Sequence, residues 1–331
     1  MLHLALSIFQ NTRNSLRAIY DSYVLPYLRR FISPGRVLTS RHLSFLNSFR
    51  RRQMGAFVYL AESDGSRIHE ARKFMDSCSF CPFSSPVVMS REEVSCQHLS
   101  AEWVVSSGDA VVLYFHGGGL FFSALEKRFM LALSHFFRSR VFLPHYRLAP
   151  EHDFLSQYDD ALISYQYLLR QGVSPANITV VGQSWGSSLA LSLLLQLQKR
   201  SLPQPASAVL MSPFLSTSWD RTLRDRVNYR GDWLLSDHVF SHRRLMGSPS
   251  DFVVDSSWSK LPPIIIQAGQ DDFFVPSLQQ MFSDASCFNE NLRLHLYPNM
   301  THNFHHLYEL SVTAEQALED AGRFIESQSR L

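Results

Sequence analysis

The sequence predicts an α/β fold in which a mostly parallel central sheet carries helices on both faces. Short, almost continuously apolar runs of strand length recur from about residue 99 onward, and helical stretches alternate with them. The helical stretch at 188–198 is apolar nearly all round, as expected for a helix buried behind a sheet. Strands that are apolar at every position are typical of a parallel sheet between two helical layers.

The strands and helices can be assigned in order along the chain. The clearest helix repeats apolar residues at helical spacing from Leu155 to Leu169 and can end at Gly172. Residues 62–97 show no strong period. The expected strands are 111–115, 141–143, 178–181, 206–211, 263–268 and 292–297, and the expected helices are 125–137, 155–169, 188–198 and 314–327.

Two segments fall outside this alternation. Residues 1–60 read as helical with a break at 33–36, and residues 216–260 form a charged, tryptophan-bearing stretch between two strands. A segment of that kind is expected above the sheet, as a lid. The predicted organisation is an N-terminal helical lid segment at 1–60, a lid insertion at 216–260, and a core made of 61–215 and 261–331.

Composition narrows the function classes. The formal charge of +2 over 331 residues gives no general case for nucleic-acid binding. Four cysteines are too few for a disulfide scaffold, and the C-x-x-C at Cys78 and Cys81 has no second pair with which to hold zinc. We therefore expect a reduced, cytoplasmic protein.

The N-terminus is strongly basic. Residues 1–52 hold nine arginines against one acid, Asp21, and apolar residues recur there at helical spacing. No apolar run approaches the ~20 residues that a membrane span needs. Three roles fit this segment: a structural or lid helix, a helix that makes peripheral contact with a membrane surface, and a transit peptide.

The motif GQSWG, Gly182 to Gly186, carries the first catalytic prediction. It lies between a strand and a helix, and glycines stand two positions before and two positions after the serine. This is the context of a nucleophile elbow, in which glycines relieve clashes in a sharp turn. Ser184 is the predicted nucleophile.

The motif HGGG, His116 to Gly119, directly follows the strand 111–115. Consecutive glycines let a loop present its backbone N–H groups, which can hold the oxyanion of a tetrahedral intermediate. We predict an oxyanion hole formed by Gly117, Gly118 and the N–H of Trp185. His116 is expected to brace this loop.

An acid and a histidine follow two later strands, each just past the carboxyl end. The order Ser184, Asp272, His302 is that of a serine–acid–histidine hydrolase, with His302 as the general base and Asp272 as its partner. Asp271 is the alternative acid. The run HNFHH offers histidines, but no ligand set pairs with it elsewhere, so we expect neither a metal nor another cofactor.

Together these residues resemble the hormone-sensitive-lipase-like branch of the α/β-hydrolases, which includes arylacetamide deacetylases and fungal steryl acetyl hydrolases. Besides HGGG and the elbow, the segment YRLAPEHDF at 146–154 is similar to the motif of that family. The resemblance covers residues 99–331. It implies the α/β-hydrolase fold, a helical lid and hydrolysis of carboxylic esters without a metal or organic cofactor.

The elbow departs from the pattern of the family, which usually has aspartate before the serine and alanine after it. Here these positions are Gln183 and Trp185. With Phe121, Phe122 and Phe273, Trp185 is predicted to bind substrate, a short acyl ester of a bulky hydrophobic alcohol such as a sterol or terpenoid. The alternatives are an acyltransferase or cyclase that uses the same triad and a non-catalytic small-molecule receptor.

Overall fold

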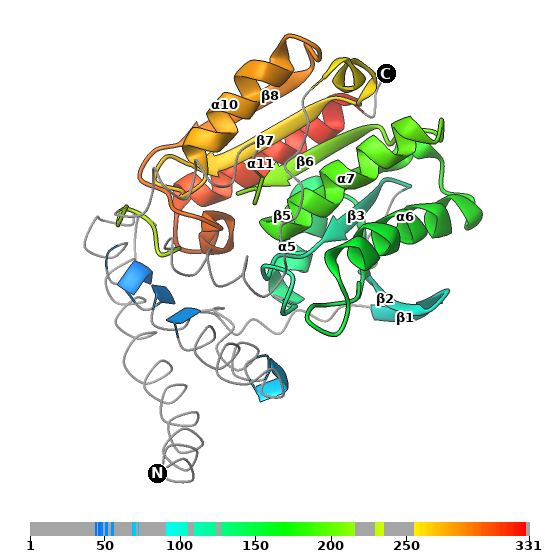
Figure 1. Cartoon of the computed structure of the whole chain (residues 1–331), viewed down its shortest axis with the longest axis horizontal. Coiled ribbons are helices and arrows are strands. Elements are labelled where there is room, and N and C mark those ends of the chain that lie inside the picture. Colours follow the sequence, from blue (N-terminus) through cyan, green and yellow to red (C-terminus); the bar gives the residue numbers. More distant parts are fainter. Residues whose placement is uncertain are drawn as a thin grey trace.

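A computed structural model describes residues 91–104, 109–123, 127–215, 229–234 and 255–328, together with isolated residues between Ser44 and Arg72. Within this part of the chain, eight strands form one sheet in the order β1-β2-β4-β3-β5-β6-β7-β8 (Figure 1). The strands are β1 (Arg91–Cys96), β2 (Leu99–Val104), β3 (Val111–Phe115), β4 (Arg140–Pro144), β5 (Ile178–Gln183), β6 (Ser207–Met211), β7 (Ile264–Gly269) and β8 (Leu292–Tyr297).

The sheet is mostly parallel, which confirms the predicted fold class. The six strands from β4 to β8 in the sheet order pair in parallel. The hairpin of β1 and β2 is antiparallel and joins β4 at the edge. Because parallel strands end at the same edge, Gln183 pairs with Met211, and Gly269 pairs with Tyr297. The loops that follow β5, β7 and β8 therefore leave the sheet on one side.

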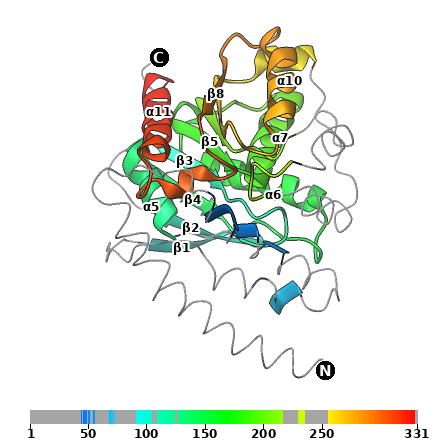
Figure 2. The same ribbon diagram turned by 90° about the vertical axis from the view of Figure 1, so that its left-hand side faces the viewer.

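Helices cover both faces of the sheet (Figure 2). On one face lie α5 and α11, and on the other lie α6, α7 and α10. Their bounds are α5 (Lys127–Phe137), α6 (Phe154–Arg170), α7 (Trp185–Lys199), α10 (Val275–Ser286) and α11 (Val312–Gln328). The described residues also form the short 3-10 helices η3 (Pro175–Asn177), η4 (Ser256–Lys260) and η5 (Phe304–Leu307).

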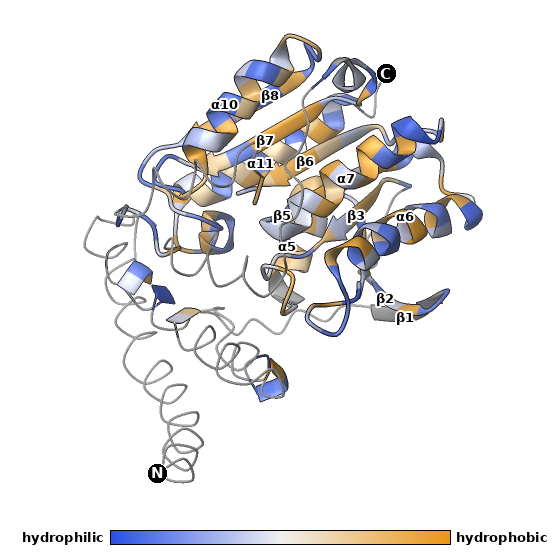
Figure 3. Cartoon of the chain, viewed as in Figure 1, coloured by the Kyte–Doolittle hydropathy of each residue, from blue (hydrophilic) through white to orange (hydrophobic). Residues whose placement is uncertain are grey.

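Successive side chains of the central strands point to opposite faces of the sheet, so the core consists of two apolar clusters, one on each face. Leu113 and Phe115 of β3 belong to the apolar cluster under α6 and α7, whereas Val112 and Tyr114 belong to the cluster under α5 and α11. Side chains of a strand point alternately to the two faces, so a strand covered on both sides must be apolar at every position. Figure 3 shows this as hydrophobic colour along the strands and on the helix sides that face them.

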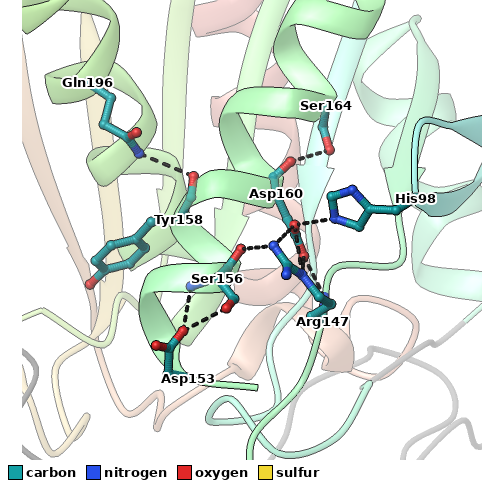
Figure 4. A network of polar contacts seen from close by, with 8 residues as sticks. All are labelled: His98, Arg147, Asp153, Ser156, Tyr158, Asp160, Ser164 and Gln196. Carbon is teal, nitrogen blue, oxygen red and sulfur yellow. Dashed lines mark hydrogen bonds and ion pairs between the residues drawn. The ribbon is translucent and has the colours of Figure 1, made fainter. Parts of the chain in front are cut away.

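A buried charge network joins α6 to the edge of the sheet (Figure 4). The carboxylate of Asp160 is fully buried and accepts hydrogen bonds from the backbone N–H and the guanidinium of Arg147. The Nε2 atom of His98, which follows β1, lies 3.0 Å from the same carboxylate. Asp153 caps the start of α6, because its side chain accepts from the backbone N–H of Ser156. The motif that begins at Tyr146 thus anchors this helix.

Every strand and helix expected between residues 111 and 327 is present to within a few residues. The hairpin of β1 and β2 was not predicted, because β1 carries two glutamates and β2 mixes polar with apolar residues, as an edge pair tolerates. Helix α10, which buries Leu278, Met281 and Ala285 at helical spacing, was not predicted either. The predicted lids at 1–60 and 216–260 lie mostly outside the described residues and stay predictions. None of the described helices combines the length and the apolar character needed to cross a membrane.

Candidate active site

Ser184 lies in the sharp turn between β5 and α7 with φ of 51° and ψ of −118°. Its neighbours enforce this strained conformation, because its N–H donates to Met211 O at 2.9 Å and its carbonyl accepts from Phe214 N at 3.0 Å. A β-carbon added at Gly186 would lie 2.0 Å from the carbonyl oxygen of Phe115. Glycine is therefore required for α7 to approach β3 this closely, and the turn holds the Ser184 hydroxyl above the sheet.

The three residues predicted as a triad form one continuous row of hydrogen bonds. Ser184 Oγ lies 2.9 Å from His302 Nε2, and His302 Nδ1 donates to Asp272 Oδ2 at 2.9 Å. The other oxygen of Asp272 accepts from the N–H of Phe274 at 2.9 Å. All three side chains are nearly buried. The carboxylate that faces the imidazole belongs to Asp272 rather than to its neighbour Asp271.

The environment of His302 favours its protonated form. Burial by itself lowers the pKa of the imidazole. The negative charge of Asp272, its hydrogen bond and the charge of Asp232 outweigh this, so that the pKa is raised above its usual 6.5. A neutral histidine with a raised pKa is a stronger base, so it can take the proton of Ser184 and hold it beside the Asp272 carboxylate.

The glycine loop after β3 lies against the nucleophile. A β-carbon added at Gly117 would lie 3.3 Å from Ser184 Cβ. Gly118 has φ of 126°, and its carbonyl accepts from the N–H groups of Phe121 at 3.1 Å and Phe122 at 3.4 Å. A β-carbon at Gly118 would collide with Phe122 O at 1.8 Å. Only glycine can therefore form this turn beside Ser184.

His116 braces the glycine loop through hydrogen bonds, as expected from the sequence. Its Nδ1–H donates to Gly117 O at 2.7 Å, and the Tyr146 hydroxyl donates to His116 O at 2.8 Å. The rings of His116 and Tyr146 stack with centroids 4.2 Å apart. Burial lowers the pKa of His116 to about 4, so the ring is neutral at pH 7 and keeps the N–H that it donates.

The four predicted substrate-binding side chains are all buried: Phe121, Phe122, Trp185 and Phe273. The indole of Trp185 lies between α7 and α6, where its Nε1–H donates to Gln157 Oε1 at 2.7 Å. It stacks on Tyr158 and meets the edge of Phe214. Trp185 is thus anchored in the core beside the site, and the substrate-binding role of the four residues stays a prediction.

Asp232 is a residue of the site that was not predicted from the sequence. Its buried carboxylate accepts hydrogen bonds from three backbone N–H groups: Trp233 and His302 donate to Oδ1 at 2.6 and 3.2 Å, and Phe273 donates to Oδ2 at 2.8 Å. Burial and the charge of Asp272 raise the pKa of Asp232 to about 7. Since the residue lies in a charged segment without any period, no local signal in the sequence indicates its place.

The geometry also bears on metal binding. Ligand atoms of Asp232, Asp272 and His302 lie within 4.8 Å of one another. Both ring nitrogens of His302 already have partners, Ser184 and Asp272, so a metal would have to displace the hydrogen-bonded row. Of the other two histidines in HNFHH, His305 faces Gln267 and His306 faces Gln183. The arrangement is suited to proton transfer.

Comparison with known proteins agrees with this geometry. A protein-family model described as "alpha/beta hydrolase fold" matches residues 112–306. An esterase of Acinetobacter venetianus is 29% identical over 235 residues, which span 67% of this chain and 76% of the relative. An acetyl-hydrolase of Streptomyces hygroscopicus is 27% identical over 242 residues, which span 70% of this chain and 81% of the relative.

Solved structures share the fold. The crystal structure of an esterase from the bacterial hormone-sensitive lipase family matches with a TM-score of 0.72 at 22% identity, covering 88% of this chain and 100% of that one. At this identity the match is evidence for the fold alone. The resemblance and the fold class predicted from the sequence are confirmed.

Proposed function

This chain belongs to the α/β-hydrolase-fold family, and on that premise we propose that it is a serine carboxylic-ester hydrolase with Ser184 as its nucleophile. The observation that carries the proposal is the row of hydrogen bonds from Ser184 through His302 to Asp272. A serine hydroxyl becomes a good nucleophile only when an oriented base removes its proton, and this row provides that base and its orientation.

In the proposed reaction, Ser184 Oγ attacks the acyl carbon while His302 takes the proton of the hydroxyl. Asp272 stabilises the imidazolium that forms. The backbone N–H groups of Gly117, Gly118 and Trp185 stabilise the oxyanion. His302 then protonates the departing alcohol, and water enters to release the acyl group from Ser184 by the same steps in reverse.

We assign the substrate to the short-chain esters, as an acetate or similar ester of a bulky hydrophobic alcohol such as a sterol or terpenoid. One relative is named an acetyl-hydrolase, which supports a short acyl group. Large buried rings, Trp185 and Phe214 among them, pack against each other next to the nucleophile, and we propose that they restrict the length of the acyl chain. A bulky alcohol would then have to lie toward the segments 1–60 and 216–260, the proposed lids.

The test is a series of p-nitrophenyl esters from acetate to decanoate, with acetylated sterols and terpenoids alongside. We expect the highest kcat/KM for the shortest acyl chains. A preference for long chains would overturn the deacetylase assignment and leave the esterase assignment intact. Turnover of the wild type without labelling of Ser184 by a fluorophosphonate would contradict both.

The two alternative functions considered from the sequence can each be tested separately. An acyltransferase or cyclase would use the same triad with an alcohol or amine in place of water, and product analysis with candidate acceptors separates it from a hydrolase. A receptor on this fold has no need of a base at His302, and the 2.9 Å contact between that base and Ser184 favours an enzyme.

We propose a cytoplasmic location, with peripheral contact to a membrane surface through the basic N-terminus as one of the roles open to that segment. The segment lies largely outside the described residues. Its test is liposome binding of the whole chain and of a form without residues 1–32.

A further inference from the structure

One carboxylate joins three separate segments of the chain next to the site. Asp232 belongs to the stretch 229–234, Phe273 follows the acid Asp272, and His302 is the base. The carboxylate of Asp232 accepts the N–H groups of both Phe273 and His302, at 2.8 and 3.2 Å. The two loops that carry the acid and the base are therefore connected to each other through a residue from a third segment.

The neighbour of Asp232 makes a second connection of the same kind. The indole N–H of Trp233 donates to the carbonyl oxygen of His302 at 2.7 Å, and its ring lies 5.7 Å from the imidazole. The backbone of His302 is thus held on both sides, its N–H by Asp232 and its carbonyl by Trp233. From the same stretch, Tyr229 OH donates to Asp271 O at 2.9 Å, just before the acid.

The stretch is itself held by the N-terminal part of the chain. Arg51 donates through Nε and Nη2 to the carbonyl oxygen of Asp232 at 3.0 and 2.6 Å, and also to Arg230 O. The guanidinium of Arg50 lies over the Trp233 ring at 5.7 Å from its centroid. Contacts therefore run from residues 50–51 through 230–233 to the acid and the base.

We propose that Asp232 and Trp233 form a positioning element that aligns the Asp272–His302 pair, Asp232 by accepting the backbone N–H groups of both loops and Trp233 by holding the His302 carbonyl. The inference deepens the proposed function and rests on it. Its physical basis is that a small displacement of the base from the serine hydroxyl is costly, because proton transfer depends steeply on geometry.

The element also acts on His302 through charge. The groups that face this cluster are the carboxylates of Asp232 and Asp272, the guanidiniums of Arg50 and Arg51, and the ring of His305. The negative charge of Asp232 raises the pKa of His302, whereas the positive charge of Arg50 lowers it. Loss of the Asp232 charge is therefore expected to lower the pKa of His302.

The first variant is Asp232→Asn in the full chain. Asparagine keeps one acceptor, places an NH2 group against the N–H of Phe273, and removes the charge. We expect kcat to fall roughly 10- to 100-fold with little change in KM, since the residue does not face the substrate. We also expect the acidic limb of the kcat/KM profile to move to lower pH. Activity is expressed per active site by titration with a fluorophosphonate.

Asp160→Asn is the matched control. Asp160 is an equally buried carboxylate, but its partners are Arg147 and His98 and not the residues of the site (Figure 4). This variant should lose stability and keep the wild-type kcat per active site and pH profile. Equal pH profiles in Asp232→Asn and the wild type, with equal kcat per active site, would overturn the proposal.

A second variant serves if Asp232→Asn does not fold. Trp233→Phe keeps an aromatic ring, makes it smaller, and removes the N–H donated to His302 O. It should lower kcat several-fold without moving the acidic limb, because no charge is lost. Wild-type kcat in Trp233→Phe would contradict the proposal. Wild-type enzyme that is not labelled by the fluorophosphonate would instead contradict the proposed function.

Discussion

The indole N–H of Trp185 donates a 2.7 Å hydrogen bond to Oε1 of Gln157, and both side chains are buried. The residue after the nucleophile is thus bonded to the helix α6, which begins at the motif around Tyr146. Gln157 in turn donates through Nε2 to Leu120 O at 3.3 Å, in the glycine-loop region. One amide therefore connects the elbow at Trp185 with the glycine-loop region at Leu120, which lies 65 residues earlier in the sequence.

The Gln157 amide gives the two loops a side-chain connection in addition to the packing of their backbones. Its oxygen faces the residue after the nucleophile, and its nitrogen faces the residue after the glycine motif. Displacement of either partner would leave a buried polar atom without its bond, which is costly. The pair therefore favours one fixed arrangement of the elbow and the glycine loop.

Replacement of Trp185 by phenylalanine should destabilise the protein. It leaves Gln157 Oε1 buried without its donor, a loss of about 1–3 kcal/mol in the free energy of unfolding. Urea denaturation measures the loss, and the double variant Trp185→Phe/Gln157→Leu should recover part of it. Additive losses in the two single variants would show that the hydrogen bond does not couple them.

Removal of the nucleophile should abolish ester hydrolysis. Ser184→Ala is expected to lower kcat for p-nitrophenyl acetate by at least about 10³-fold, because loss of a nucleophile is seldom compensated. Circular dichroism serves as the control for folding. Turnover near the wild-type level in a folded variant would contradict the assignment of Ser184.

The pH profile should report His302. The imidazole must be neutral to accept the proton of Ser184, and its pKa is raised above 6.5, so activity should decline as the pH falls through a value above 6.5. Asp272→Asn removes the main group that raises this pKa, and the surviving activity should have its acidic limb at lower pH. A limb that stays in place in Asp272→Asn would argue against the pairing.

His116 should contribute to instability in acid. Burial depresses its pKa in the folded protein to about 4, whereas the unfolded chain has about 6.5. The unfolded state therefore binds the proton first, and stability present above pH 6.5 is lost as the pH falls toward 4, by up to about 3 kcal/mol. Unfolding free energies at pH 7 and 4.5 should differ less in His116→Asn than in the wild type.

Gly118→Ala should lower the activity of the enzyme as well as its stability. Its φ of 126° and the collision with Phe122 O would force the glycine loop away from Ser184. We expect kcat to fall by about 10²-fold or more for all acyl lengths, as for loss of an oxyanion donor. Gly172→Ala is the matched control, because φ there is 81° but a β-carbon meets nothing within 4 Å. That variant should keep its kcat.

The central strands, the helices beside them and the residues of the hydrogen-bonded row could be predicted from the sequence, whereas the hairpin of β1 and β2 and the helix α10 could not. Central strands covered on both faces must be apolar throughout, and the elbow needs glycines at fixed positions, so both leave local patterns. Ser184, Asp272 and His302 each follow an expected strand, and parallel strands bring such positions to one edge. Between the two adjacent acids Asp271 and Asp272, the contact to His302 selects Asp272.

The direction of the Trp185 indole and the contacts of Asp232 depend on the packing of distant segments and could not be predicted from the sequence. The indole turns to Gln157 on a neighbouring helix, and the Asp232 carboxylate meets backbone groups 41 and 70 residues away. A residue whose partners are backbone N–H groups of distant loops places no requirement on the residue types beside it. Local patterns record what a turn or a buried face needs, whereas these contacts exist only once separate loops meet at the same edge of the sheet.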